Sequence, residues 1–175
     1  MDALIFIVES VLSLAVFAFL LRFLLSLMRV DFRNPLSQAV LSLTNWLVLP
    51  LRRVLPPIRR MDTASLVALV AVQLLATFLM FRLRAGALIP VMPLVKLGLI
   101  SLVTSTIRLF QVLIFVYALL SFIAPGTYSP VGGLLSSLCE PLLRPLRRVL
   151  PVIGGLDFSP LVALIGLQAL LILIT

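Results

Sequence analysis

The heptapeptide Pro50-Leu-Arg-Arg-Val-Leu-Pro56 recurs letter for letter as Pro145-Leu-Arg-Arg-Val-Leu-Pro151, at an offset of 95 residues. Extended without gaps, residues 50–73 and 145–168 agree at 14 of 24 positions. The aligned pairs include Asp62 with Asp157 and Gln73 with Gln168. Similarity at one fixed offset indicates an internal repeat, so the chain is expected to contain one structural unit twice.

The composition places this repeat in a membrane. Of the 175 residues, 62% are hydrophobic and only 11% are charged, whereas a soluble domain has about 25% charged residues. So few charges cannot cover the surface of a soluble monomer, which predicts an all-α integral membrane protein. The expected spans are residues 3–28, 63–81, 97–123 and 156–175. About 20 residues cross a bilayer, so the last span, apolar from Pro160 onward, must begin earlier, tilt little or meet a locally thinned bilayer.

Two shorter segments have an apolar stripe at helical spacing and a polar opposite face. They lie at residues 36–49 and 134–142 and are too short to cross. We expect amphipathic helices that are interfacial or re-entrant. Because proline removes a backbone donor, Pro50 is expected to end the first helix in a stiff turn, and Pro141 is expected to limit the second.

The predicted organisation is two tandem parallel repeats. Residues 1–81 and 97–175 form the repeats, and residues 82–96 connect them. Two spans in each repeat return the chain to its starting side, which relates the repeats by a pseudo-two-fold axis along the membrane normal. The positive-inside rule then places the two motif loops in the cytoplasm and both termini in the periplasm. These loops contain nine Arg residues: Arg29, Arg33, Arg52, Arg53, Arg59, Arg60, Arg144, Arg147 and Arg148.

Several classes of activity have no residues to support them. The chain has no His and a single Cys, Cys139, so it lacks the side chains of a zinc site, a Ser–His triad or a disulfide. No phosphate loop, paired-carboxylate site or nucleophile elbow is present. We therefore predict no catalytic residue, metal or cofactor. The net charge of +8 is interpreted as topology, since the cations flank apolar segments, and direct nucleic-acid binding is not expected.

The duplicated motif is the first candidate site. Paired guanidinium groups bind phosphate oxygens well, so Arg52, Arg53, Arg147 and Arg148 are candidates for contacts with anionic headgroups or a partner protein. The alternative is that they only orient the chain and extend toward the headgroups. Asp62 and Asp157 are expected to cap the following helix and to pair with an Arg of their own motif.

Polar residues within the spans are the second candidate site, because ionisable groups at membrane depth are often functional. The repeat alignment predicts a Glu9–Arg108 pair between the first and third spans. It also predicts a hydrogen bond between Gln73 and Gln168 across the pseudo-two-fold axis. The alternative to a transport role is a purely structural one. Arg22 is expected to reach the cytoplasmic interface.

These residues together resemble the YggT family of small bacterial inner-membrane proteins. The resemblance lies in the repeated Pro-Leu-Arg-Arg-x-Leu-Pro…Asp segment, preceded by Arg22-Phe-Leu-Leu-Ser26 and Asn34-Pro35, and it covers nearly the whole chain. The first repeat departs from the pattern at Arg59-Arg60, where the second has Gly154-Gly155. Tyr117 aligns with Arg22. The two motif sites are therefore not expected to be equivalent.

The resemblance implies no established biochemical activity or catalytic residue. It links the chain to osmotic and ion stress in bacteria, and to cell division or nucleoid distribution in photosynthetic lineages. We predict a non-enzymatic inner-membrane protein that organises the membrane or assists assembly through its cytoplasmic Arg/Pro motifs. Its expected partners are membrane lipids and a second copy or another membrane protein. The alternative is a small oligomeric transporter or channel component in osmotic or ion homeostasis.

Overall fold

The computed structural model describes residues 2–28, 30, 34–56, 62–123, 129–149 and 157–174. Every regular element in these ranges is an α-helix, which confirms the predicted all-α class for the described residues. The helices are α1 (Asp2–Leu27), α2 (Pro35–Val54), α3 (Thr63–Ala85), α4 (Val91–Ile123), α5 (Pro130–Val149) and α6 (Ser159–Ile174).

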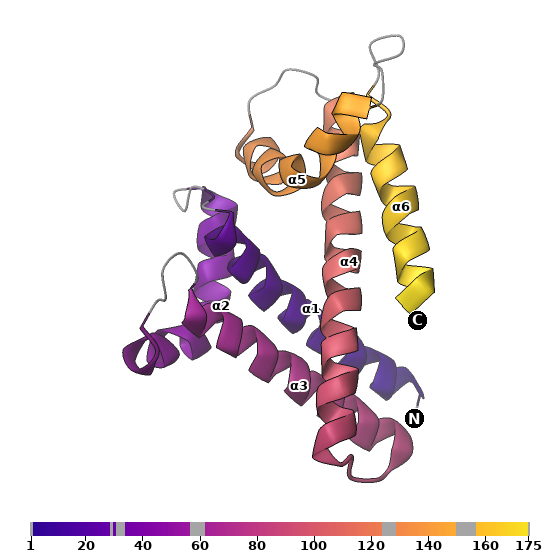
Figure 1. The fold of residues 1–175 in the computed structure, drawn as a ribbon. Helices are drawn as coiled ribbons and strands as arrows, with labels where there is room; N and C mark the ends of the chain where they lie inside the picture. The colour runs from indigo at the N-terminus through magenta and orange to yellow at the C-terminus, as the bar shows by residue number, and fades with distance from the viewer. Residues whose placement is uncertain are drawn as a thin grey trace.

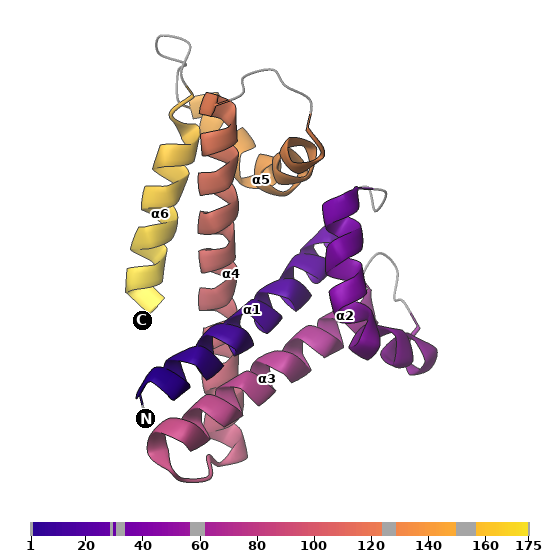
Figure 2. The same cartoon turned by 180° about the vertical axis from the view of Figure 1, so that it is seen from behind.

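Two antiparallel helix pairs form the body of the molecule. In Figure 1, α1 runs from the N-terminus toward α2, and α3 returns in contact with it. Helix α4 likewise runs toward α5, and α6 returns in contact with α4. The α1–α3 pair is inclined to the α4–α6 pair, as both views show (Figures 1 and 2). Helix α2 lies where α1 ends and α3 begins, and α5 occupies the corresponding place between α4 and α6.

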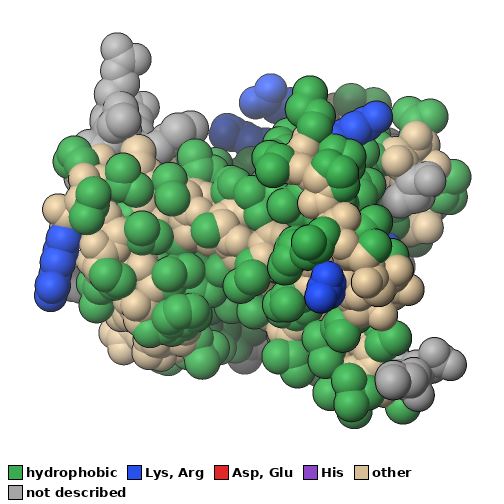
Figure 3. All heavy atoms as spheres, turned by 90° about the horizontal axis from the view of Figure 1, so that it is seen from below, with side chains coloured by type: hydrophobic (Ala, Val, Ile, Leu, Met, Phe, Trp, Pro, Cys, Tyr) green, Lys and Arg blue, Asp and Glu red, His purple; other side chains and the backbone are tan. Residues whose placement is uncertain are grey.

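Among the described residues, three helices are long and apolar enough to cross a membrane: residues 3–27 of α1, α3 and α4. Only 17–33% of their most apolar windows is buried, so much of their apolar surface faces outward, where lipid can solvate it. Figure 3 shows hydrophobic side chains over most of the face that it views, with scattered cations. Helix α6 is a shorter apolar helix of 16 residues.

The connection between the two halves is shorter than the predicted loop at residues 82–96. Helix α3 continues through Arg82 and Arg84 to Ala85, and α4 begins at Val91. Gly86 ends α3 with φ 66°, a left-handed conformation that glycine adopts without strain, and its N–H donates to the Arg82 carbonyl. Cations in the last turn interact favourably with the helix dipole, so Arg82 and Arg84 support this longer helix.

The amphipathic segments are longer helices than the prolines predicted. Helix α2 continues through Pro50 to Val54, and α5 continues through Pro141 and Pro145 to Val149. The expected stiff turn at Pro50 and the expected stop at Pro141 are therefore wrong. All three prolines are exposed, so a carbonyl that loses its helical partner can bond water or a headgroup instead. That exposure reduces the cost of an interior proline.

The core lies where these two helices meet the long ones. Leu25 of α1, Val48 of α2, Ile114 of α4 and Leu138 of α5 are completely buried. Ala64 and Ala68 allow α3 to approach closely. The two halves are also joined by a hydrogen bond, in which Asn34 Nδ2 donates to the Pro130 carbonyl at 2.5 Å. Asn34 Oδ1 in turn accepts from the Leu36 N–H and caps α2. The amphipathic helices are thus fixed to the body and to each other.

Gly98 of α4 is buried and packs tightly against Leu74 of α3. A Cβ at this position would lie 2.5 Å from Leu74 Cδ2, whereas a Cβ at Gly166 of α6 would meet nothing within 4 Å. We expect Gly98→Val to destabilise the protein by about 1–3 kcal/mol through overpacking, and Leu74→Ala to recover part of the loss. Thermal unfolding in detergent would measure this, with Gly166→Val as the matched control. Equal melting temperatures for the two valine variants would contradict the packing.

Candidate functional site

In the first repeat, the duplicated motif forms a charged bridge between α2 and the start of α3. Arg52, in the last turn of α2, donates to the Asp62 carboxylate. Asp62 caps α3, because its Oδ2 accepts from Ser65 Oγ at 2.6 Å and its Oδ1 from the Ser65 N–H. Burial alone would raise the pKa of Asp62, but the hydrogen bonds from Arg52 and Ser65 outweigh burial and lower it. The predicted cap and Arg–Asp pair are both confirmed here.

In the second repeat, Arg147 has three partners. Its guanidinium donates to Asp157 Oδ2 at 2.8 Å, to Glu140 Oε2 at 2.9 Å and to the Tyr117 hydroxyl at 3.0 Å. It also lies 5.9 Å from the centre of the Tyr117 ring. Burial opposes the charge of Arg147, but the bonds to Tyr117 and Asp157 prevail and raise its pKa. The hydrogen bonds of Arg147 therefore join α5 to Tyr117 of α4 and to Asp157, which precedes α6.

Asp157 also stabilises the beginning of α6. Its Oδ1 accepts from the Ser159 N–H at 2.9 Å, which satisfies one of the free donors at a helix N-terminus. Burial would raise the pKa of Asp157, but the bonds from Ser159 and Arg147 lower it. The Arg–Asp pair predicted for this repeat is thus confirmed as well.

The prediction that Arg22 reaches the cytoplasmic interface is wrong. Arg22 does not extend to the interface, because it is only 2% exposed. Its guanidinium donates to Thr44 Oγ1 and Asn45 Oδ1, each at 2.8 Å, and to Ser65 Oγ at 3.2 Å. These bonds tie α1 to α2 and α3. The polar residues Thr44 and Asn45 of α2 are the sequence signal that could have indicated the burial of Arg22, because they accept its hydrogen bonds.

The repeat offset shows how the two networks differ. Arg22 aligns with Tyr117, and Asn45 aligns with Glu140. The first network therefore contains two cations, Arg22 and Arg52, around one carboxylate, whereas the second contains one cation around two carboxylates. Both repeats contain the Arg–Asp pair, but the net charge of the groups around it is opposite, which agrees with the expectation that the motif sites are not equivalent.

Three further motif arginines lie within the described residues and have no such contacts there. Arg53, Arg144 and Arg148 are exposed, and within the described residues none of them has an ion pair. Arg29, Arg33, Arg59 and Arg60 lie outside the described residues. In each Pro-Leu-Arg-Arg motif the first arginine is thus paired with an aspartate of the same repeat, and the second is exposed without an ion pair among the described residues. The prediction of headgroup or partner binding consequently rests on Arg53 and Arg148 rather than on Arg52 and Arg147.

The only cysteine of the chain lies beside the second network. Cys139 of α5 is completely buried, and burial raises the pKa of its thiol to about 12, against a smaller opposing effect of Arg147. A thiol is reactive as the thiolate, so this one is inert at neutral pH.

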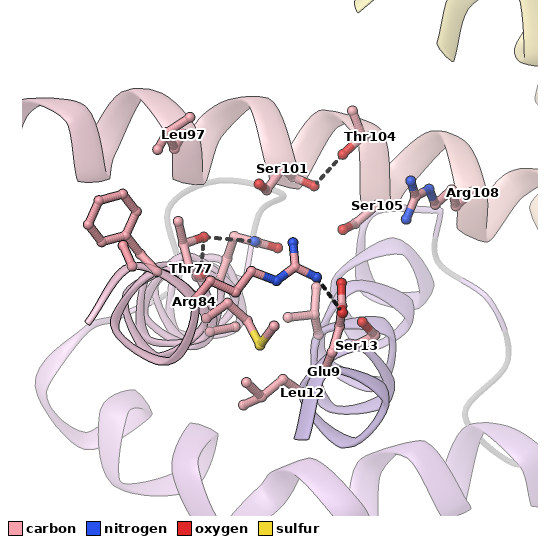
Figure 4. Close-up of a pocket in the computed structure, with 16 residues that line it drawn as sticks. Glu9, Leu12, Ser13, Thr77, Arg84, Leu97, Ser101, Thr104, Ser105 and Arg108 are labelled. Carbon is pink, nitrogen blue, oxygen red and sulfur yellow. Dashed lines mark hydrogen bonds and ion pairs between the residues drawn. The ribbon is translucent and has the colours of Figure 1, made fainter. Parts of the chain in front are cut away.

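A polar cleft lies between α1, α3 and α4, toward the N-terminus and the α3–α4 turn. It has a volume of about 540 Å³. In Figure 4, Glu9 of α1 faces Arg84 of α3, and the two form an ion pair at 2.7 Å. The predicted Glu9–Arg108 pair is therefore wrong, although both residues line this cleft. The reason is the unforeseen last turn of α3, which brings Arg84 to Glu9.

The two symmetry-related glutamines also have partners other than each other. Gln73 is buried in α3, and its Nε2 donates to Thr77 Oγ1 at 3.3 Å. Gln168 of α6 accepts from Gln111 Nε2 of α4 at 2.9 Å. The predicted Gln73–Gln168 bond is therefore replaced by a contact within α3 and a contact between α4 and α6. Both glutamines satisfy at least one polar group inside an apolar helix, as packing in a membrane requires.

Fold and site together define a chain of membrane-spanning type, organised around a charged motif that occurs twice. The family model described as CCB3/YggT matches residues 1–83 and again residues 97–175, and the chain belongs to this family. It is 38% identical over 167 residues to an uncharacterised protein of Pseudomonas aeruginosa, covering 95% of this chain and 85% of that one. It is 35% identical over 172 residues to the uncharacterised protein YggT of Escherichia coli K12, covering 97% and 88%. No solved structure matches the chain.

The contacts of Arg22 predict a large effect on stability. We expect Arg22→Gln to lower the stability by at least about 2 kcal/mol, because hydrogen bonds from a buried charged donor are lost. The control is Arg53→Gln, which removes the same charge from an exposed position and should change stability by less than about 0.5 kcal/mol. Thermal unfolding in detergent distinguishes them. A melting temperature for Arg22→Gln within about 2 °C of the control would contradict the anchoring role.

The lowered pKa values of Asp62 and Asp157 predict a dependence on acid. Because folding lowers both pKa values, the ionised carboxylates stabilise the fold above their usual pKa of 3.8, and this contribution is lost as the pH falls further. The double variant Asp62→Asn/Asp157→Asn should therefore melt below the parent at pH 7, and the difference should shrink toward pH 3. Melting curves across this range test the prediction. A difference that stays constant down to pH 3 would show that ionisation is not involved.

Proposed function

We propose that this chain is a non-enzymatic inner-membrane protein that crosses the bilayer four times, as two tandem parallel repeats. The course of the helices supports this arrangement: α1 and α4 run toward the motif helices, and α3 and α6 return from them (Figure 1). In each half, the amphipathic helix occupies the same place relative to its long pair. Helix α6 serves as the fourth span, although its 16 residues extend only about 24 Å, which requires little tilt or a locally thinner bilayer.

The proposed orientation places α2 and α5 on the cytoplasmic side. The free arginines Arg53, Arg144 and Arg148 all belong to these two helices, and the positive-inside rule assigns such residues to the cytoplasm. The N-terminus, the α3–α4 turn and the end of α6 would then face the periplasm. Trp46 is 69% exposed and its ring contacts Phe19 of α1 edge to face, which supports an interfacial position of α2. Tryptophan is enriched at this depth of the membrane.

The function that we propose for this surface is to organise the membrane or to assist assembly. The amphipathic helices form a cytoplasmic platform, defined as the exposed faces of α2 and α5, that binds anionic headgroups or a partner protein. One observation carries the proposal: in each motif the first arginine is paired with an aspartate, while the second is exposed and has no ion pair among the described residues. Orienting the chain in the membrane requires only positive charge. The paired arginine in each motif instead fixes the end of the amphipathic helix, and the unpaired arginine has a guanidinium free to bind a phosphate group.

Two sets of variants separate binding from folding. Arg53→Gln/Arg144→Gln/Arg148→Gln should retain the melting temperature of the parent in detergent but lose most of the stabilisation that added phosphatidylglycerol provides. Arg52→Gln/Arg147→Gln should melt lower without lipid and still be stabilised by phosphatidylglycerol. Melting curves with and without the lipid measure both effects. An unchanged lipid effect in the triple variant would exclude headgroup binding, and crosslinking in native membranes would then test the protein-partner form of the platform.

A second candidate function is a small oligomeric transporter or channel component in osmotic or ion homeostasis. The polar cleft between α1, α3 and α4 favours this candidate, because polar side chains gather there inside apolar helices. Solute flux in proteoliposomes tests it, with Glu9→Gln and Arg108→Gln expected to abolish flux while expression stays normal. Absence of flux in folded parent protein would remove this candidate.

A further inference from the structure

Arg108 occupies an unusual place in the polar cleft. It is the eighteenth of the 33 residues of α4, near the middle of the longest helix. Its side chain lies beside Ser105 at the edge of the cleft (Figure 4). Within the part of the chain that the structure describes, no side chain forms an ion pair or hydrogen bond with it. Arg108 is exposed on the surface of the chain, and in the proposed arrangement of α4 as a membrane span its guanidinium requires water or an anion from outside the chain.

The carboxylate that lines the cleft does not neutralise Arg108. Glu9 is paired with Arg84 at 2.7 Å, and that ion pair leaves the single positive charge of Arg108 uncompensated. An opposite charge brought into the cleft would therefore be attracted. Arginine binds carboxylate and phosphate through two parallel hydrogen bonds, so an oxyanion fits this position best.

A second unpartnered group lies in the same cleft. Gln73 is 6% exposed and lines the cleft, and its Oε1 has no hydrogen-bond partner among the described residues. A buried carbonyl oxygen without a donor costs free energy, and a ligand hydroxyl or amine would remove that cost. Ser13 and Ser105 add hydroxyl groups near Arg108. The cleft thus offers a cation for an anionic group and an acceptor for a donor.

We propose that this cleft binds a small hydroxylated organic anion. Its carboxylate or phosphate group pairs with Arg108, and one of its hydroxyl groups donates to Gln73 Oε1. The volume of about 540 Å³ is within the range of small-molecule sites and is larger than a bare phosphate ion needs. The glycerol phosphate group satisfies these requirements, whether it belongs to a free solute or to a lipid headgroup. The site is independent of the platform on α2 and α5, because it lies at the other end of the helices.

Binding to purified protein in phosphatidylcholine nanodiscs tests the proposal, with glycerol 3-phosphate, gluconate and inorganic phosphate as probes. Calorimetry should show that the two hydroxylated anions bind more tightly than inorganic phosphate. Arg108→Gln should weaken the binding of both by about tenfold, as expected for the loss of a charge-assisted hydrogen bond. The matched control is Lys96→Gln, which removes an exposed cation from α4 outside the cleft and should leave affinity unchanged.

Two further variants separate electrostatics from a structural role. Glu9→Gln should tighten binding several-fold, because it removes the carboxylate and releases Arg84. Gln73→Leu should weaken the binding of glycerol 3-phosphate and leave the binding of inorganic phosphate unchanged, because only the former carries an alcohol hydroxyl separate from the phosphate that pairs with Arg108. A purely structural role of these residues would not change affinity in opposite directions.

The source of the ligand is distinguished by the lipid. If a headgroup supplies the anion, nanodiscs with phosphatidylglycerol should compete with the soluble probes, and native mass spectrometry should show phosphatidylglycerol retained by the parent and lost from Arg108→Gln. If a solute supplies it, phosphatidylglycerol should have no effect on probe binding. The proposal is overturned if neither the probes nor phosphatidylglycerol bind the parent, or if Arg108→Gln binds as well as Lys96→Gln. It is also overturned if Arg108→Gln alters only the oligomeric state.

Discussion

The salt bridge from the end of an amphipathic helix to the start of the next long helix is the contact on which the architecture depends. It occurs twice, as Arg52–Asp62 and Arg147–Asp157, across connections of the same length. Each aspartate also accepts from the first turn of the following helix, so one carboxylate fixes both where that helix begins and how the amphipathic helix lies against it. The other polar contacts of the amphipathic helices reach the preceding long helix, from Arg22 to Thr44 and Asn45 and from Arg147 to Tyr117, so this bridge is the charged link to the helix that follows.

The buried polar groups extend this contact into the body. Ser65 donates to Asp62 and accepts from Arg22, so the bridge at the surface continues through the first turn of α3 to the C-terminal part of α1. In the second half, the uncharged Tyr117 aligns with Arg22, and its hydroxyl accepts a hydrogen bond from Arg147. The protein therefore retains the connection in both repeats while exchanging the charged partner. The Arg–Asp pair is common to both repeats, whereas the residues around it differ.

Much of this could be predicted from the sequence, for identifiable reasons. Apolar length and the exact repeat specify the long helices and the equivalence of Asp62 and Asp157, since both are local or directly aligned features. The limits of α2 and α5 could not be predicted from Pro50 and Pro141, because the cost of an interior proline depends on which face it occupies. The partner of Glu9 depended on one additional turn of α3, and the burial of Arg22 depended on how three helices converge. Contacts between distant segments were thus the part that pattern alone did not determine.

Cys139 has a practical consequence for studying this protein. Its sulfur is enclosed between helices of the second half, and its thiol remains protonated far above neutral pH, so alkylating reagents have no access to a reactive thiolate. The natural chain thus behaves as if it were cysteine-free toward maleimides. A single cysteine introduced at the α3–α4 turn or near the end of α2 would be the sole labelled position, and the side of the membrane from which it reacts would be read without altering any native residue of the core.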